Sequence, residues 1–257
     1  MHQILLIMRY DGSGYHGWQI QHNADTVQGT LQKAISQITQ ENVHVIGCGR
    51  TDTGVHAEIY AASFLTHSRI PTEKFPAALN SMLPYDISII SAHNISNDFH
   101  PIRSCTRKEY TYTIYSSPSR DPFLHGRALH ITHKLDLDKI RLAAQQFVGT
   151  HDFSAMRSLG TDVSSTVRTV YNYDIVENGN MVKFITSANG FLYNMARTMA
   201  GTLLHVSSGK IDPSSISDIL NSGNRNLAGP TAPACGLALT QLWYNDFTDL
   251  KELSYVR

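Results

Sequence analysis

Charged residues are few in this sequence, and neither sign is in excess. Of its 257 residues, 16% are Asp, Glu, Lys or Arg, and 21 basic residues balance 21 acidic ones. Nucleic-acid-binding proteins usually carry a global basic excess, which this chain lacks. Any surface for a polyanion must therefore come from local clustering of Lys and Arg. Hydrophobic residues make up 42% of the chain, which excludes a disordered or fibrous protein.

Cysteine and long apolar runs are also scarce. The three cysteines, Cys48, Cys105 and Cys235, are far apart and show no C-x-x-C spacing, so neither a disulfide framework nor a zinc site is expected. The histidines are scattered and form no H-E-x-x-H motif, which leaves a metal site unsupported. The N-terminus reads as a strand without signal-peptide features, and no apolar run has the length of a membrane span. We expect a cytoplasmic protein without a membrane segment or a metal.

The apolar pattern predicts strands and helices in the order β, α, β, β, α, β, twice over. In the first half these are residues 3–10, a helix from the N-cap Thr26 to about Thr39, 43–48, 58–66, 72–83 and 86–97. In the second half they are 108–115, 135–149, 167–177, 181–188, 191–207 with a short helix from about Pro213, and 236–244. We expect an α+β fold of two split βαβ halves, 1–105 and 106–257.

A glycine motif near the N-terminus has the spacing of a dinucleotide-binding site. Gly12, Gly14 and Gly17 form G-x-G-x-x-G directly after the first strand. In a dinucleotide-binding fold a helix opens on that turn, and an acidic residue follows about 20 residues later. Here the helix begins only near Thr26, and Glu41 starts no convincing nucleotide site. No nicotinamide cofactor is therefore expected.

Asp52 lies in the glycine-rich turn 49–54. Between Glu41 and Glu58 the only other charged residue is Arg50. One interpretation is a hairpin whose Asp makes a local Asx-turn. The other is a carboxylate in a partly buried cleft, kept ionised by a nearby guanidinium. The segment alone leaves both open.

Arg197 is isolated in the same way. From Phe184 to Gly209 it is the only charged residue if His205 is counted as neutral, and the helix around it is apolar on nearly all sides. A lone Arg on a buried helix needs an anionic partner, because an unpaired buried charge is very costly. The alternative is an Arg that snorkels at the helix rim. Asp52 is an available partner.

The segment RKEYTYTIY, residues 107–115, alternates as a strand. Tyr110, Tyr112 and Ile114 then face one side, after the basic pair Arg107 and Lys108. Tyr112 is best explained as an ordinary strand aromatic. For Tyr110 the alternative is a stacking surface or a proton-handling phenol in a nucleic-acid site.

These segments together resemble motifs of the TruA family of tRNA pseudouridine synthases. In chain order, the matching segments are YDGSGYHGWQIQ (10–21), TVQGTLQKAI (26–35), GRTDTGVHA (49–57), RKEYTY (107–112), GTHDFSA (149–155), GFLYNMAR (190–197) and AGPTAPACGL (228–237). The resemblance covers nearly the whole chain. It implies that Asp52 is the catalytic aspartate, Tyr110 the active-site tyrosine and Arg197 the arginine that pairs with the aspartate. Arg50 would hold the target base out of its stack.

The resemblance also implies the wider architecture and the substrate. The fold would be two RRM-like halves that form a continuous antiparallel sheet flanked by helices, with a basic central cleft. The protein would work as a homodimer without metal or cofactor, on uridines 38, 39 and 40 of the tRNA anticodon stem-loop. The sequence departs from the family pattern at Thr53, where Ala is commoner, at Ala196, where Val is common, and at Ile102–Arg103, where an Arg-Phe pair is usual.

The reaction breaks a C–N bond and makes a C–C bond between the same two rings, so it needs no redox change. An ionised Asp52 suits it, as a nucleophile or as a stabiliser of a cationic sugar. The candidates for holding the RNA backbone are Arg103, Arg107, Lys108, Arg157, Arg168 and Arg225. Two rival classes are a non-catalytic RNA-binding module of RRM-like fold and a carboxylate glycosidase. The glycosidase would need a second acid, and the motifs offer none.

Overall fold

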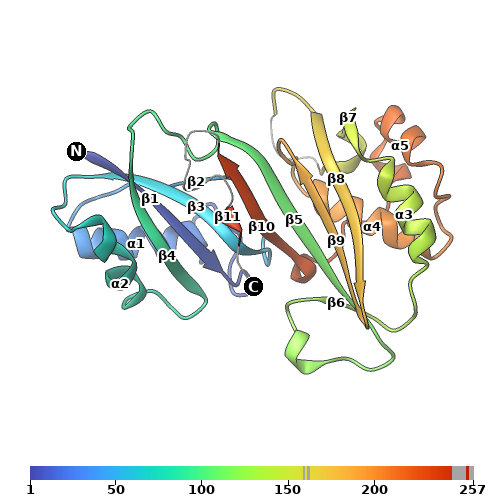
Figure 1. Ribbon diagram of the computed structural model, residues 1–257, viewed down its shortest axis with the longest axis horizontal. Coiled ribbons are helices and arrows are strands. Elements are labelled where there is room, and N and C mark those ends of the chain that lie inside the picture. Colours follow the sequence, from blue (N-terminus) through green and yellow to red (C-terminus); the bar gives the residue numbers. More distant parts are fainter. Residues whose placement is uncertain (159, 161–162, 245–252, 255–257) are drawn as a thin grey trace. The chain divides into compact units, whose positions relative to one another are not determined.

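The computed structural model describes residues 1–158, 160, 163–244 and 253–254 (Figure 1). By their contacts they form two compact units, Met1–Thr106 together with the strand from Leu239, and Arg107–Ala238. Each unit combines helices with a mostly antiparallel sheet, which confirms the α+β class. The assignment of domains to 1–105 and 106–257 stays a prediction. None of the helices in the described part of the chain is long and apolar enough to cross a membrane.

The first unit is built around its N-terminal strand. Its elements are β1 (His2–Tyr10), α1 (Val27–Thr39), β2 (Ile46–Gly47), β3 (His56–Thr66), the 3₁₀ turn Thr72–Lys74, α2 (Phe75–Asn80), β4 (Ile87–Ile95), most of β10 (Leu237–Tyr244) and β11 (Leu253–Ser254). Strand β1 pairs antiparallel with β3 on one edge and with β4 on the other. Six consecutive residues of β1, from Gln3 to Met8, are buried. This continuous burial means that both faces of β1 are shielded from solvent, which matches its nearly unbroken apolar sequence.

Helix α1 begins where its sequence predicts. The side-chain oxygen of Thr26 accepts a hydrogen bond from the backbone N–H of Gly29 at 3.3 Å, and this cap satisfies one of the amides that the first turn leaves unpaired. Its apolar side, with Val27, Leu31 and Ile35, is buried. The helix packs against α2, which in turn packs against β4 (Figure 1).

The predicted strand 43–48 is paired only at Ile46–Gly47. Two glutamines of α1 explain the difference. Gln28 donates from its side-chain nitrogen to the carbonyl of Val45 at 2.8 Å, and Gln32 accepts from the backbone N–H of Val45 at 3.2 Å. Since these side chains satisfy the backbone groups of Val45, the strand needs no ladder partner there.

The second unit holds the remaining elements. They are β5 (Cys105–Ser116), β6 (Leu129–Ile131), α3 (Leu137–Gln145), β7 (Gly149–Asp152), β8 (Val167–Asn178), β9 (Met181–Ala188), α4 (Met195–Ser207) and α5 (Ile216–Ser222), with 3₁₀ turns at Pro122–Leu124, Ser154–Met156, Arg225–Leu227 and Ala234–Gly236. The sheet order is β5-β9-β8-β7, and β6 runs parallel beside β5. Helix α3 packs against α4 and against β8.

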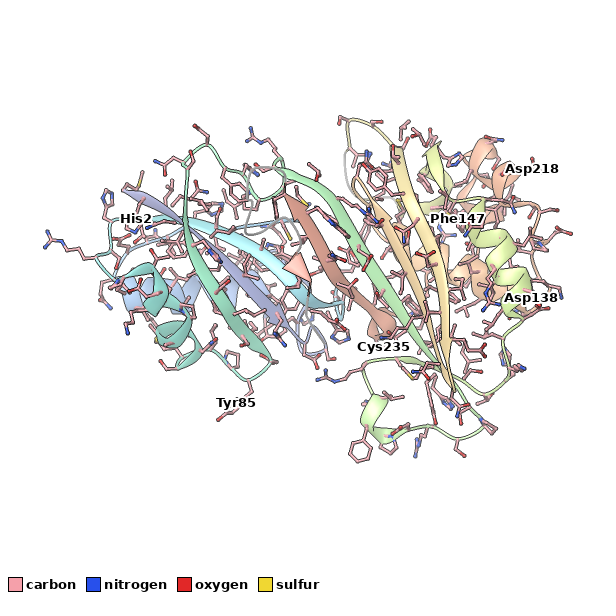
Figure 2. The ribbon with its side chains drawn as sticks, in the orientation of Figure 1. His2, Tyr85, Asp138, Phe147, Asp218 and Cys235 are labelled. Carbon is pink, nitrogen blue, oxygen red and sulfur yellow. The ribbon has the colours of Figure 1, made fainter. Side chains whose placement is uncertain are left out.

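The core of this unit is rich in aromatic rings. Phe147, labelled in Figure 2, is fully buried, and its ring centroid lies 5.8 Å from that of Tyr173 on β8. Tyr112 of β5 is paired with Phe184 of β9, and both are buried. Tyr85 of the first unit, by contrast, is fully exposed and projects from the turn before β4 (Figure 2).

Two predicted helices begin differently from their sequence pattern. The segment 72–83 opens as a 3₁₀ turn, and its α-helix covers only Phe75–Asn80. Helix α4 was predicted from residue 191 and begins at Met195, because Asn194 before it is left-handed, with φ at 60°. A residue with that backbone geometry interrupts a right-handed helix.

Candidate active site

Asp52 occupies the first position of a tight turn between β2 and β3. The backbone N–H of Val55 donates to the carbonyl of Asp52 at 3.1 Å, and Gly54 between them has φ at 77°. A positive φ at the third position of a four-residue turn favours glycine. The side chain of Asp52 is half-buried, and its neighbours Thr51 and Val55 on either side are buried. The carboxylate therefore projects from a backbone whose position is fixed.

The segment Tyr10–Trp18 fixes the side of the turn that precedes Asp52. Trp18 donates its backbone N–H to the carbonyl of Thr51 at 3.1 Å, and the hydroxyls of Tyr10 and Thr51 share a hydrogen bond of 2.9 Å. Tyr60 of β3 donates its hydroxyl to the carbonyl of Gly49. The rings of Tyr10, Trp18 and Tyr60 form one buried cluster with centroids 4.3–6.5 Å apart.

Two glycines of the same segment allow the chain to approach this turn. A Cβ on Gly12 would lie 2.0 Å from the carbonyl oxygen of Val55, and one on Gly17 would lie 2.5 Å from that of Thr51. Gly17 also has φ at 84°. The G-x-G-x-x-G spacing therefore marks close contact between two loops, on either side of Asp52. Helix α1 begins only at Val27, which agrees with the expectation that the motif is not a nucleotide site.

Arg50 and Arg103 also belong to the first unit. Both side chains are exposed. Arg50 lies two residues before Asp52 in the same loop, and Arg103 lies in the turn before β5. Each is accessible to a polyanion.

Arg197 lies in the first turn of α4, in the second unit. Its Nε donates to the carbonyl of Ala232 at 2.8 Å, and its Nη1 donates to the side-chain oxygen of Asn194 at 2.8 Å. Ala232 returns a bond from its backbone N–H to the carbonyl of Arg197 at 3.1 Å. The side chain is partly exposed. Two of its five N–H groups thus orient the guanidinium.

The segment 228–237 wraps closely around α4. A Cβ on Gly201 of the helix would lie 1.8 Å from the carbonyl oxygen of Pro230. Gly229 donates its backbone N–H to the hydroxyl of Thr202 at 2.9 Å. This close packing places the backbone of Ala232 within hydrogen-bonding distance of Arg197. The motif AGPTAPACGL therefore has a structural role.

Tyr110, Tyr112 and Ile114 share one buried side of β5, as the strand pattern predicts. The ring of Tyr110 meets that of Phe191 edge-on, with centroids 4.9 Å apart. The hydroxyl of Tyr112 donates to the carbonyl of Pro233 at 2.8 Å, and burial raises the pKa of Tyr112. Tyr112 therefore ties β5 to the segment that holds Arg197, which agrees with its structural interpretation.

Three of the arginines proposed to hold RNA donate to acceptors of the protein itself. Arg107 donates from Nε to the hydroxyl of Ser187 at 2.8 Å and from Nη2 to Asn172 at 3.0 Å. Its guanidinium also lies 5.4 Å from the centre of the Tyr171 ring, a cation–π contact. These contacts orient Arg107 at the start of β5.

Arg168 and Arg225 each close a local loop. Arg168 donates to the carbonyl of Ser165 at 2.9 Å. Arg225 donates to the carbonyl of Gly229 at 2.8 Å and to the hydroxyl of Thr231 at 3.2 Å. Burial lowers the pKa of both guanidinium groups. The remaining candidates, Lys108 and Arg157, are partly exposed.

Within the described residues, no three side chains of His, Cys, Asp or Glu gather in a way that could hold a metal ion.

Comparison with known proteins identifies the family. The family model described as tRNA pseudouridine synthase matches residues 6–102 and 143–245. A tRNA pseudouridine synthase A of Thermoanaerobacter sp. (strain X514) is 45% identical over 95% of this chain and 100% of its own length. Those of Ruminiclostridium cellulolyticum and Clostridium perfringens, the latter named tRNA pseudouridine synthase A 2, are 46% and 41% identical with the same coverage. The chain belongs to the tRNA pseudouridine synthase family, which confirms the resemblance.

Two residues of this region were missed by the sequence argument. His56 contacts the turn after β1, and Asn194 holds Arg197 from a left-handed backbone. The sequence offered a weak signal for both, since His56 lies within the motif GRTDTGVHA and Asn194 lies within GFLYNMAR. Neither role follows from residue type and spacing alone.

Proposed function

We propose that this chain isomerises uridine to pseudouridine in tRNA and that Asp52 is the carboxylate responsible. The observation that carries the proposal is membership of the tRNA pseudouridine synthase family, with Asp52 inside the matched residues 6–102. The turn that presents Asp52 supports it, because a reacting carboxylate must be held within a fraction of an ångström of its target.

The isomerisation is balanced within the uridine. The bond from C1′ to N1 breaks, a bond from C1′ to C5 forms, the C5 proton leaves and N1 gains a proton. Ionised Asp52 assists while the base is detached, by covalent attack on the ribose or the base or by stabilising a cationic sugar. The reaction consumes no oxidant, reductant or energy source, so it needs no redox or energy-carrying cofactor.

Arg197 and Tyr110 complete the proposed catalytic group. Arg197 keeps Asp52 ionised, since a nearby positive charge stabilises a carboxylate. Its fixed guanidinium, held by Ala232 and Asn194, supports that role. Tyr110 either removes the C5 proton or stacks on the base. Arg50 holds the flipped base out of the stem-loop, and its exposed position beside Asp52 in the sequence supports this.

The substrate region and the assembly follow from the resemblance. We propose uridines 38, 39 and 40 of the anticodon stem-loop as the targets, and a homodimer in which one tRNA touches both subunits. Backbone contacts come from Arg103, Arg107, Lys108, Arg157, Arg168 and Arg225. The cytoplasm, where tRNA is processed, is the proposed location, and it suits the three free thiols.

We also propose that each half is RRM-like. In the first unit β4-β1-β3 are neighbours, β2 pairs with β3, and the helices lie between β1 and β2 and between β3 and β4 along the chain. This is the order of a split βαβ fold. In the second unit the order β5-β9-β8 follows the same scheme. The continuous sheet and the central cleft remain predictions.

The test is conversion of an anticodon stem-loop transcript labelled with tritium at C5 of uridine. The wild-type protein should release tritium and form pseudouridine, and Asp52→Asn and Asp52→Ala should lose at least about 10³-fold in rate, as removal of a nucleophile does. Circular dichroism should show both variants folded. Near wild-type turnover in either folded variant would rule out Asp52. A wild-type protein that binds the transcript without converting it would favour the RNA-binding module.

A further inference from the structure

His56 begins β3 four residues after Asp52, and the proposed chemistry gives it no task. Its Nδ1 lies 3.1 Å from the backbone nitrogen of Gly12 and 3.1 Å from Oδ1 of Asp11. The imidazole is 12% exposed. A polar side chain in that setting normally has a partner, and here the partner is the turn that follows β1.

We propose that His56 is a positioning residue for Asp52. The inference rests on the proposed function. The turn Asp52–Val55 is closed by the bond from the Val55 N–H to the Asp52 carbonyl. The carbonyl of Val55 packs against Gly12, and His56 binds the amide of that same glycine. The contact and the hydrogen bond together hold the end of the turn against residue 12.

The two sides of the turn are held by different contacts. Before Asp52 the ties come from Tyr10 and Trp18, whose rings are part of the buried core. After Asp52 they come from the amide of Gly54, which donates to the carbonyl of Tyr15 at 3.3 Å, and from His56. Loss of a core ring would destabilise the whole unit. Loss of the imidazole should release one end of the turn and leave the core intact.

The two neighbours of Nδ1 require different protonation states of this nitrogen. An unprotonated Nδ1 accepts the Gly12 N–H, whereas a protonated Nδ1 donates to Asp11, and one nitrogen cannot do both at once. Asp11 has a second donor in the backbone N–H of Ser13 at 3.0 Å. Either state ties His56 to the turn at residues 11–12. The positioning role therefore holds in both.

Substitution can separate the position of this nitrogen from the bulk of the ring. Asparagine carries its amide group at about the distance of Nδ1 from the backbone, so its oxygen can accept the Gly12 N–H. Glutamine is longer and reaches about as far as Nε2. If His56 acts through Nδ1, Asn should replace it and Gln should not.

The experiment measures kcat, KM and tRNA affinity for His56→Ala, His56→Asn and His56→Gln. His44→Ala, at an exposed histidine of the same unit, is the matched control. We expect His56→Ala to lower kcat by about 10- to 100-fold, because a misplaced reacting group costs rate. KM and tRNA affinity should stay within about twofold, because nothing that holds the RNA has changed. His56→Asn should recover most of kcat. His56→Gln should have the low kcat of His56→Ala. The control His44→Ala should have the kcat of the wild type.

Hydrogen exchange gives a readout that does not depend on turnover. Amides in peptides covering residues 10–18 and 49–57 should exchange faster in His56→Ala than in the wild type, and His56→Asn should restore the slow exchange. If His56→Ala does not fold, the comparison of kcat between His56→Asn and His56→Gln tests the inference. Wild-type kcat in His56→Ala, or equal kcat in the Asn and Gln variants, overturns the inference and leaves Asp52 untouched. A wild-type protein without activity overturns the proposed function instead.

Discussion

The two units hold their proposed catalytic side chains on different kinds of backbone. In the first, Asp52 projects from irregular backbone that is held by residues 10–18, far away in the sequence. In the second, Arg197 stands on a regular helix, and its guanidinium donates both to Asn194, three residues before it, and to the carbonyl of Ala232. The carboxylate thus depends on an irregular loop held by long-range packing, and the guanidinium depends on a regular helix supported by both a local and a distant contact. The two sites should fail in different ways when they are disturbed.

The largest effect is expected at the glycines where the chain packs most closely. Gly12→Ala would bring a methyl group to 2.0 Å from the Val55 carbonyl, and Gly201→Ala would bring one to 1.8 Å from the Pro230 carbonyl. Each should lower the free energy of unfolding by about 2–3 kcal/mol, because neither neighbour is a flexible side chain that can yield. Urea unfolding measures this.

Gly14→Ala is the matched control, since nothing lies within 4 Å of its added Cβ. Its unfolding midpoint should stay close to that of the wild type. A Gly12→Ala protein that unfolds at the wild-type urea concentration would show that the turn around Asp52 can move aside, so that close packing does not fix its position.

A smaller effect is expected at Asn194. Both Asn194→Ala and Asn194→Gly remove the acceptor of Arg197 Nη1, so both should lower kcat by a similar factor. Only Asn194→Ala should also lose about 1 kcal/mol of stability relative to Asn194→Gly, because alanine is strained at φ near 60°. Paired kcat and urea measurements check this. Unchanged kcat in both variants would mean that the bond to Asn194 is not needed to orient Arg197.

The smallest effect is expected at the basic pair before Tyr110. Arg107→Gln and Lys108→Gln should each reduce the slope of log affinity against log salt by about 1 if each side chain neutralises one tRNA phosphate. Arg107→Lys keeps the charge and loses the contacts with Ser187 and Tyr171. It should keep the slope and weaken binding. Lys33→Gln, at an exposed position of α1, is the control. An unchanged slope for Arg107→Gln and Lys108→Gln would exclude these two contacts.

Elements set by local signals were predictable from the sequence. Helix α1 has its cap at Thr26, and β8 and β9 cover 167–178 and 181–188, close to their predicted ranges. Where a distant side chain intervenes, the prediction was wrong. Gln28 and Gln32 take over the backbone of Val45, and no pattern within 43–48 could have revealed this.

In the candidate site, too, some features were visible in the sequence and others depend on distant contacts. The isolation of Asp52 and Arg197 among apolar neighbours was visible in the sequence, as was the buried side of β5 that carries Tyr110. The roles of Gly12 and Gly17 were not, because a close approach between two loops involves residues about forty positions apart. The contact of His56 with Gly12 is hidden for the same reason.

The contact between Gly12 and the turn at Asp52 has a consequence for how the protein is made. Residues 10–18 leave the ribosome before Asp52, but they can hold its turn only once β3 has come back to pair with β1, as in the register Leu5 opposite Ser63. Contacts of such long sequence separation form late, because the chain loses the entropy of loop closure before the contacts can stabilise it. A nascent chain would therefore contain the whole turn before the contacts that hold Asp52 in place have formed.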